Sequence, residues 1–167
     1  TPGGAKAPVA SARLVDITGK SVGTAVFTPL GRGELTARVT VTIDAAVTGS
    51  LGQFHGFHIH ANNDDDNADG NTDDGCITST NPDPATWFTQ VDGHWDSGGH
   101  AHGTHTGDLP SLLRQADGEA VLEFVVDKFT ALALPGTALI VRFKAADFGK
   151  QPLEDKLRIH YANNSWK

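Results

Sequence analysis

The sequence predicts an all-β fold, either a sandwich or a flattened Greek-key barrel. The chain contains 19 glycines and 8 prolines among 167 residues, which is typical of many short strands joined by turns. Between residues 35 and 43 apolar and polar side chains alternate without a break, as expected for an antiparallel strand with one buried face. No segment longer than a couple of helical turns has the periodicity of a helix. The length suits a single domain with a proper core.

The strands can be followed in chain order. Residues 1–9 are rich in small residues, proline and glycine and are expected to form a flexible N-terminal tether, with one domain spanning 10–167. The expected strands are 10–16, 21–28, 35–43, a histidine-bearing strand within 52–60, 120–126 and 138–143. The stretch Leu132-Ala133-Leu134-Pro135-Gly136 is expected to turn between the last two, and residues 144–167 have weak periodicity.

Charge and composition exclude several classes of protein. A net charge of −7 argues against binding to nucleic acid or to an anionic membrane surface. No run approaches the roughly 18 apolar residues of a membrane span. Cys76 is the single cysteine, so no disulfide can form within the chain.

The stretch Gly56-Phe57-His58-Ile59-His60 carries the first chemical signal. Alternate side chains of a strand face opposite sides, so Phe57 and Ile59 can enter the core while His58 and His60 project together from the other face. Two imidazoles held in this way suit copper or zinc. A strand with two solvent-facing histidines would be the plain alternative if no further ligands followed.

Further candidate ligands do follow, in a long polar segment. All but one of the eight histidines lie between residues 55 and 105, and residues 61–107 are mostly Asn, Asp, Gly, Thr, Ser and His. A segment this long without periodicity is usually functional or disordered, and a metal would order it. Its candidate ligands are His94, His100, His102 and His105, with Asp108 just beyond it. For His100 an exposed loop position remains an equal alternative.

These motifs resemble a known family. Gly56-Phe57-His58-Ile59-His60, Gly93-His94, His105-Thr106-Gly107-Asp108-Leu109-Pro110 and Ala146-Asp147-Phe148-Gly149 resemble the copper/zinc superoxide dismutases, in particular the bacterial secreted type, over residues 10–150. The resemblance implies a Greek-key β-barrel of about eight antiparallel strands and dismutation of superoxide to oxygen and hydrogen peroxide. It also implies a secreted or periplasmic bacterial protein, a monomer or homodimer, with copper and zinc as cofactors.

The resemblance also implies a role for each candidate ligand. His58 and His60 match copper ligands, and His94 matches the histidine that bridges copper and zinc. His105 and Asp108 match zinc ligands, and the remaining zinc histidine is His100 or, preferably, His102. His55 matches a structural position without metal. Arg158 matches the catalytic arginine that guides superoxide to copper.

Two departures weaken the expected copper site. Arg142 stands where the family has the fourth copper histidine, and a guanidinium has no lone pair to donate. Ala146 replaces an aspartate that supports both metals, and Tyr161 lies near the expected second cysteine of the family disulfide. We therefore expect zinc binding, doubtful copper binding and impaired or lost dismutation. The alternatives are a non-catalytic zinc-binding or copper-handling protein, an outward-facing Arg142, and His160 as either a replacement ligand or a surface residue.

An acidic insertion follows the histidine strand. Within residues 65–74, oxygen-bearing side chains alternate around Gly70 as at the start of a calcium loop. The twelfth position is Cys76 and not a bidentate glutamate, so a solvated acidic loop is the favoured alternative to a calcium site.

Overall fold

The computed structural model describes residues 9–43, 54–63, 68, 70, 72, 75–82, 87–99, 104–145 and 159–163, with the backbone alone for 89, 142–145 and 159–163. The expected tether (except Val9), most of the acidic insertion and residues 100–103 and 146–158 lie outside this part of the chain. Within it, no helix is long and apolar enough to cross a membrane.

The all-β prediction is confirmed. The eight strands are β1 (Ala10–Val15), β2 (Ser21–Pro29), β3 (Leu35–Thr42), β4 (Phe54–His60), β5 (Asp108–Leu113), β6 (Glu119–Val126), β7 (Ala138–Ala145) and β8 (Ile159–Asn163). Among the described connections, two contain a short 3-10 helix, η2 (Thr89–Val91) and η3 (Ala131–Ala133). The hydrophobic pattern did not predict β5 or β8. In β5 only Leu112 is fully buried and Pro110 interrupts the segment, so no alternation is visible.

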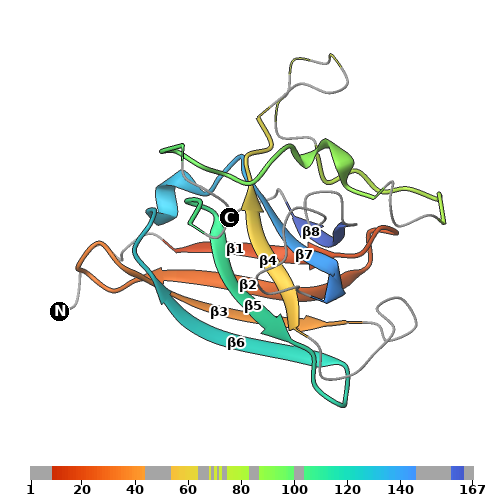
Figure 1. Ribbon diagram of the computed structural model, residues 1–167, viewed down its shortest axis with the longest axis horizontal. Helices are drawn as coiled ribbons and strands as arrows, with labels where there is room; N and C mark the ends of the chain where they lie inside the picture. The colour runs from red at the N-terminus through yellow and green to blue at the C-terminus, as the bar shows by residue number, and fades with distance from the viewer. Residues whose placement is uncertain are drawn as a thin grey trace, which may run out of the picture.

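The strands form one antiparallel sheet in the order β5-β4-β7-β8-β1-β2-β3-β6. The pairs β3–β6 and β4–β7 join strands that are distant in sequence, which gives Greek-key connectivity. β5 and β6 lie in contact, but within the described residues no ladder joins them. The sheet therefore curls into two layers, β1–β2–β3–β6 against β5–β4–β7, and the barrel is open along one seam (Figure 1).

The main core lies between these layers. Phe27, Val39, Phe57, Ile59 and Val141 are all fully buried in it. A second, smaller cluster covers the opposite face of β4 and β7; its members are Ile17, Trp87, Phe88, Val91, Ala138 and Ile140. β4 is consequently buried on both faces, which is unusual for a strand of an antiparallel sheet, and His58 and His60 lie against His94 of the following segment.

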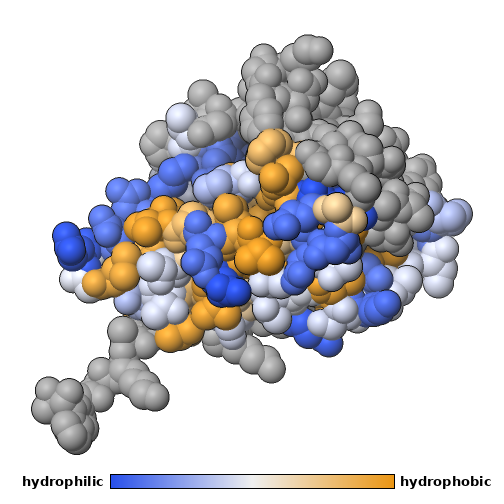
Figure 2. Space-filling model, turned by 90° about the horizontal axis from the view of Figure 1, so that it is seen from below, coloured by the Kyte–Doolittle hydropathy of each residue, from blue (hydrophilic) through white to orange (hydrophobic). Residues whose placement is uncertain are grey.

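Apolar side chains also reach the outer surface. Val26, Val121 and Val125 are exposed on β2 and β6. Seen from below, apolar side chains are interspersed with hydrophilic ones (Figure 2).

Candidate metal centre

β4 supplies the first two histidines, and their side chains lie on the face that the alternation of side chains along a strand predicts. Phe57 and Ile59 enter the main core, whereas His58 and His60 project from the opposite face, 8% and 3% exposed. Opposite them on β7, His58 pairs with Ile140 and His60 with Ala138, both members of the second cluster. The two imidazoles thus lie in a covered, low-dielectric layer.

The connecting segment brings His94 to the same face. Residues 91–95 run beside the end of β4: Ala61 N donates to Gly93 O (3.0 Å), Trp95 N donates to Ile59 O (2.8 Å), and His60 and His94 form an isolated bridge. The His94 ring stacks on His58, with centroids 4.1 Å apart, and meets the His60 ring edge-on at 4.9 Å.

A tight turn at Gly107 adds His105 and Asp108. Gly107 N donates to Trp95 O (2.7 Å), and Gly107 O accepts from Ile59 N (2.8 Å). A Cβ on Gly107 would lie 2.4 Å from Ile59 O, so the close approach requires glycine. Within the turn Asp108 Oδ2 accepts the His105 N–H (2.9 Å).

Lys128 closes this turn from outside. Its Nζ donates to His105 O (3.0 Å) and Asp108 O (3.2 Å). The backbone on both sides of the turn is therefore held by one ammonium group, which no sequence motif indicated.

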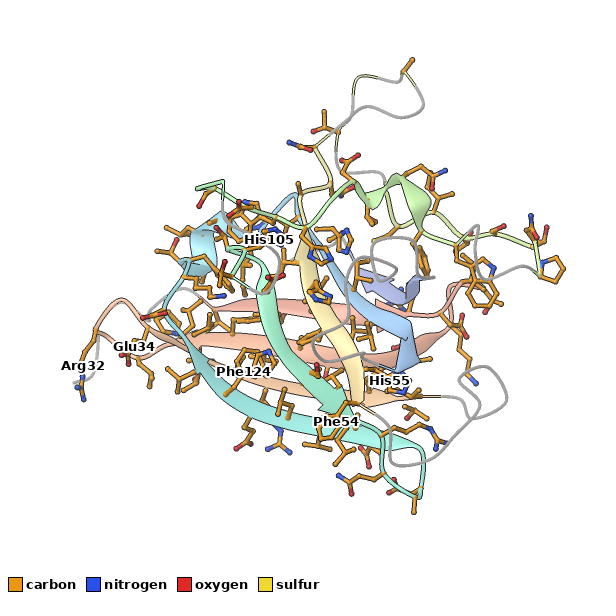
Figure 3. All side chains as sticks on the ribbon, viewed as in Figure 1. Arg32, Glu34, Phe54, His55, His105 and Phe124 are labelled. Carbon is orange, nitrogen blue, oxygen red and sulfur yellow. The ribbon has the colours of Figure 1, made fainter. Side chains whose placement is uncertain are left out.

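The donor atoms of His94, His105 and Asp108 converge closely. His94 Nδ1 lies 3.3 Å from His105 Nδ1 and 3.3 Å from Asp108 Oδ1, and His105 Nδ1 lies 3.4 Å from Asp108 Oδ2. Ligands about 2.1 Å from a tetrahedral zinc ion are about 3.4 Å apart. The His94–His105 and His94–Asp108 distances match this spacing, while His105 lies near the other Asp108 oxygen, so the donor set fits zinc in chemistry and, around His94, in spacing. Figure 3 shows His105 beside other imidazoles near the ends of β4 and β5, while His55 lies at the other end of β4.

A second, wider group overlaps the first. The donor atoms of His58, His94 and Asp108 all lie within 4.8 Å of one another, with His58 Nε2 4.0 Å from Asp108 Oδ1. His60 Nδ1 hydrogen-bonds the Asp92 carbonyl (2.7 Å). Because a carbonyl can only accept, this contact puts the ring proton on Nδ1 and leaves Nε2 as the ligating nitrogen. Asp92 is a functional residue that sequence reasoning missed, although it lies two positions before His94.

Electrostatics keep Asp108 ionised. Burial opposes ionisation of this carboxyl, but the His94 imidazole 3.3 Å away, the His105 amide and the nearby His58 ring together hold its pKa well below its usual range. The site therefore presents a carboxylate to a cation at neutral pH.

Other predicted site residues are not brought into this cluster by the described structure. His55 is fully buried near the start of β4. His100, His102, Ala146 and Arg158 lie outside the described residues, as does the Arg142 side chain. The Arg142 backbone follows Val141 on β7, and Val141 pairs with Phe57 next to His58. Cys76 packs against the second cluster, and burial raises the pKa of its thiol.

Fold and site together define a Greek-key β-barrel protein with a candidate metal centre where β4, the start of β5, residues 91–95 and the turn at 105–107 meet. Residues 21–163 match the copper/zinc superoxide dismutase (SODC) family. The chain therefore belongs to this family, whose metals are copper and zinc.

Individual relatives agree with this assignment. The chain is 32% identical over 125 residues to a Cu-Zn superoxide dismutase of Mycobacterium tuberculosis, covering 72% of this chain and 49% of the relative. It thus spans about half the length of that relative. It is 29% identical over 162 residues to the Cu-Zn superoxide dismutase of Deinococcus radiodurans, covering 87% and 77% of the two chains.

Solved structures support the fold. A SOD-like protein from Bacillus subtilis superposes with a TM-score of 0.63 at 20% identity, covering 92% of this chain and 95% of that one. The clock protein EA4 superposes with a TM-score of 0.62 at 17% identity, covering 98% and 96%.

Proposed function

We propose that this chain binds zinc and that its superoxide dismutation is weakened or lost because Arg142 takes the place of a copper ligand. The observation that carries the zinc proposal is the position of His94 Nδ1, 3.3 Å from both His105 Nδ1 and Asp108 Oδ1, with His105 Nδ1 3.4 Å from the second Asp108 oxygen. His102 would complete an N3O set of the kind that holds tetrahedral zinc.

The charge of the site supports this choice. A buried dication is stabilised by an ionised carboxylate, and Asp108, whose pKa lies below its usual range, retains its negative charge at neutral pH. A metal shared by His94, His105 and Asp108 would also tie the polar segment to the start of β5, giving that segment a reason to be ordered.

Copper would be held by His58, His60 and His94. When bound, copper supplies the one-electron redox chemistry that superoxide dismutation requires. The chain offers three imidazoles for it, while Arg142 adds a permanent cation with no lone pair. At an effective dielectric near 20, a unit charge about 4 Å from another costs about 4 kcal/mol, and roughly twice that opposite a divalent ion. The substitution thus opposes copper binding and, through it, activity.

The same substitution favours a second candidate function. A family member that keeps the barrel and the zinc ligands but has Arg142 and Ala146 at the copper site would act as a non-catalytic zinc-binding or copper-handling protein. Three histidines can still hold copper weakly, which suits transfer better than turnover.

Metal content and a superoxide assay test the proposal. After loading with copper and zinc, we expect stoichiometric zinc, substoichiometric copper and little turnover. Stoichiometric copper with robust turnover in the wild-type chain would contradict impairment, and absence of zinc would contradict the zinc site.

A repair experiment distinguishes the two candidate functions. Arg142→His combined with Ala146→Asp is expected to raise copper affinity by about 10–100-fold, whereas the matched control Arg38→His, on the exposed face of β3, leaves it unchanged. Gain of turnover with copper favours an impaired enzyme. Copper bound without turnover favours the non-catalytic function, and unchanged copper affinity would show that Arg142 is not at the copper position.

A further inference from the structure

A second polar site lies at the end of β5 remote from the metal centre. A cavity of about 1170 Å³ opens there between the β1–β2 turn, the end of β3, the 78–82 segment and the β5–β6 turn. Its apolar lining includes Ile17, Val22, Ile43 and Trp87. The volume is ample for a small organic ligand.

Arg114 gives this cavity its chemistry. The residue is 4% exposed and lines the cavity, and its Nε donates to Ile43 O (2.7 Å). Its Nη1 is buried and has no hydrogen-bond partner within the described residues. Gly118 leaves room for the group, since a Cβ there would come within 3.2 Å of Arg114 Nη2. Among the described residues this guanidinium has no counter-ion, and burying an unpaired cation is costly, so an anionic ligand would stabilise it.

The carboxylates of the lining are engaged elsewhere. Asp16 Oδ1 accepts the amides of Thr18 (2.9 Å) and Lys20 (3.1 Å), and Asp117 Oδ1 accepts the amide of Glu119 (2.9 Å). Each therefore closes its own turn, and within the described part of the chain neither forms an ion pair with Arg114. Lys20 and Asp117 are exposed at the rim, which leaves Arg114 as the buried charge of the described lining.

The walls are preformed by hydrogen bonds. Ser79 N donates to Ile17 O (3.0 Å), and the Trp87 indole N–H donates to Asn81 O (2.8 Å). These bonds fix the 78–82 segment against the β1–β2 turn. With its N–H engaged, the Trp87 ring offers the cavity an apolar surface.

We propose that this cavity binds an organic monocarboxylate with an apolar or aromatic body. The Arg114 guanidinium is a permanent cation that donates charge-assisted hydrogen bonds to a carboxylate. Because Nε is bonded to Ile43 O and Nη1 is buried, Nη2 makes the first contact, and a second bond requires a small shift of the side chain toward the cavity. The body of the ligand packs against Ile17, Ile43 and Trp87. A purely inorganic anion would leave this apolar wall unused.

Benzoate tests the proposal, with benzamide as its neutral counterpart and sodium chloride as the ionic-strength control. Calorimetric titration of the wild-type chain should give saturable benzoate binding, with chemical-shift changes at the Trp87 indole N–H. Benzamide should bind about tenfold more weakly or not at all. No saturable benzoate binding up to about 10 mM, or equal binding of benzamide, would overturn the site.

Variants locate the charge. Arg114→Met should weaken benzoate binding by at least about tenfold, and Arg114→Lys should weaken it less, because it keeps the charge and loses the fork. Arg38→Met, which removes an exposed arginine paired with Glu123, should bind benzoate as the wild type does. Unchanged binding by Arg114→Met would contradict the proposal. If that variant fails to fold, the comparison of benzoate with benzamide on the wild type still decides.

Metal loading separates this site from the metal centre. The dissociation constant of benzoate should be equal in the metal-free and zinc-loaded chains. Binding seen only after zinc loading would mean that the carboxylate ligates the metal, and the cavity proposal would fall while the proposed zinc site would stand.

Discussion

The two ends of β5 carry buried charges that the protein treats in opposite ways. Asp108 begins the strand and Arg114 follows its last residue. The Asp108 carboxylate has imidazoles of His58, His94 and His105 around it and accepts a backbone amide. Among the described residues Arg114 has one backbone carbonyl as a hydrogen-bond partner.

This contrast teaches how function can be inferred from burial. Charged side chains are rarely buried unless paired, because the loss of hydration must be offset. At Asp108 the nearby imidazoles and the His105 amide offset the lost hydration, and the same imidazoles are candidate ligands for a cation. At Arg114 the offset is missing from the described structure, which is why a ligand is the natural partner. The comparison holds only if Asp108 affects zinc binding and Arg114 affects carboxylate binding, each independently of the other.

Asp108→Asn should have the largest effect. The amide keeps the shape of the carboxylate but removes the charge that favours a dication, so zinc affinity should fall by about 1000-fold, or about 4 kcal/mol. Competition with a chromogenic chelator measures this. Asp117→Asn, in the exposed turn between β5 and β6, is the control and should leave zinc affinity unchanged. Equal zinc binding by both variants would remove Asp108 from the metal site.

Gly107→Ala should destabilise the fold at the metal end. The new Cβ would lie 2.4 Å from Ile59 O and 3.1 Å from the Trp95 Cβ, so backbone must move. A loss of about 2–3 kcal/mol in the free energy of unfolding is expected, measured by urea denaturation of the metal-free chain. Gly93→Ala is the control, because no atom of the described residues beyond its chain neighbours lies within 4 Å of the place its Cβ would take. Similar losses for both glycines would mean that the turn is not closely packed.

Lys128→Met should have a smaller effect on zinc. The side chain is exposed, but it holds the carbonyls of His105 and Asp108 from outside. Its loss should lower zinc affinity by about tenfold, the low end for a group that orients metal ligands, with little change in the unfolding of the metal-free chain. Lys20→Met tests whether any lysine would do the same. A fall in stability without a change in zinc affinity would assign Lys128 a purely structural role.

The sequence predicted the fold better than it predicted the support of the site. Alternation located six of the eight strands and the opposite facing of Phe57 and His58, because side-chain period in a strand is fixed by geometry. The hydrophobic pattern did not predict β5, because the register of this strand is set by pairing with β4 and by the Gly107 turn. Such pairing leaves no periodic trace in a six-residue segment containing Pro110.

The histidines were visible in sequence, but the groups that orient them were not. His94, His105 and Asp108 stood out as residue types with metal chemistry. Asp92 acts through its backbone carbonyl and Lys128 through a contact formed by folding, so neither has a signal at its own position. Arg114 is likewise an ordinary arginine until its burial is known.

Arg114→Met should have the smallest effect on stability and so sharpens the comparison most. Methionine has a similar length and no charge, so the variant removes the cost of an unpaired buried cation and also loses the hydrogen bond to Ile43 O. These opposing contributions should leave the free energy of unfolding within about 1 kcal/mol of the wild type in the absence of ligand. Arg38→Met, exposed on β3, gives the baseline for removing any arginine. If the free energy of unfolding falls by about 3 kcal/mol or more for Arg114→Met alone, the guanidinium is already paired within the protein. The charges at both ends of β5 would then be balanced by groups of the protein itself.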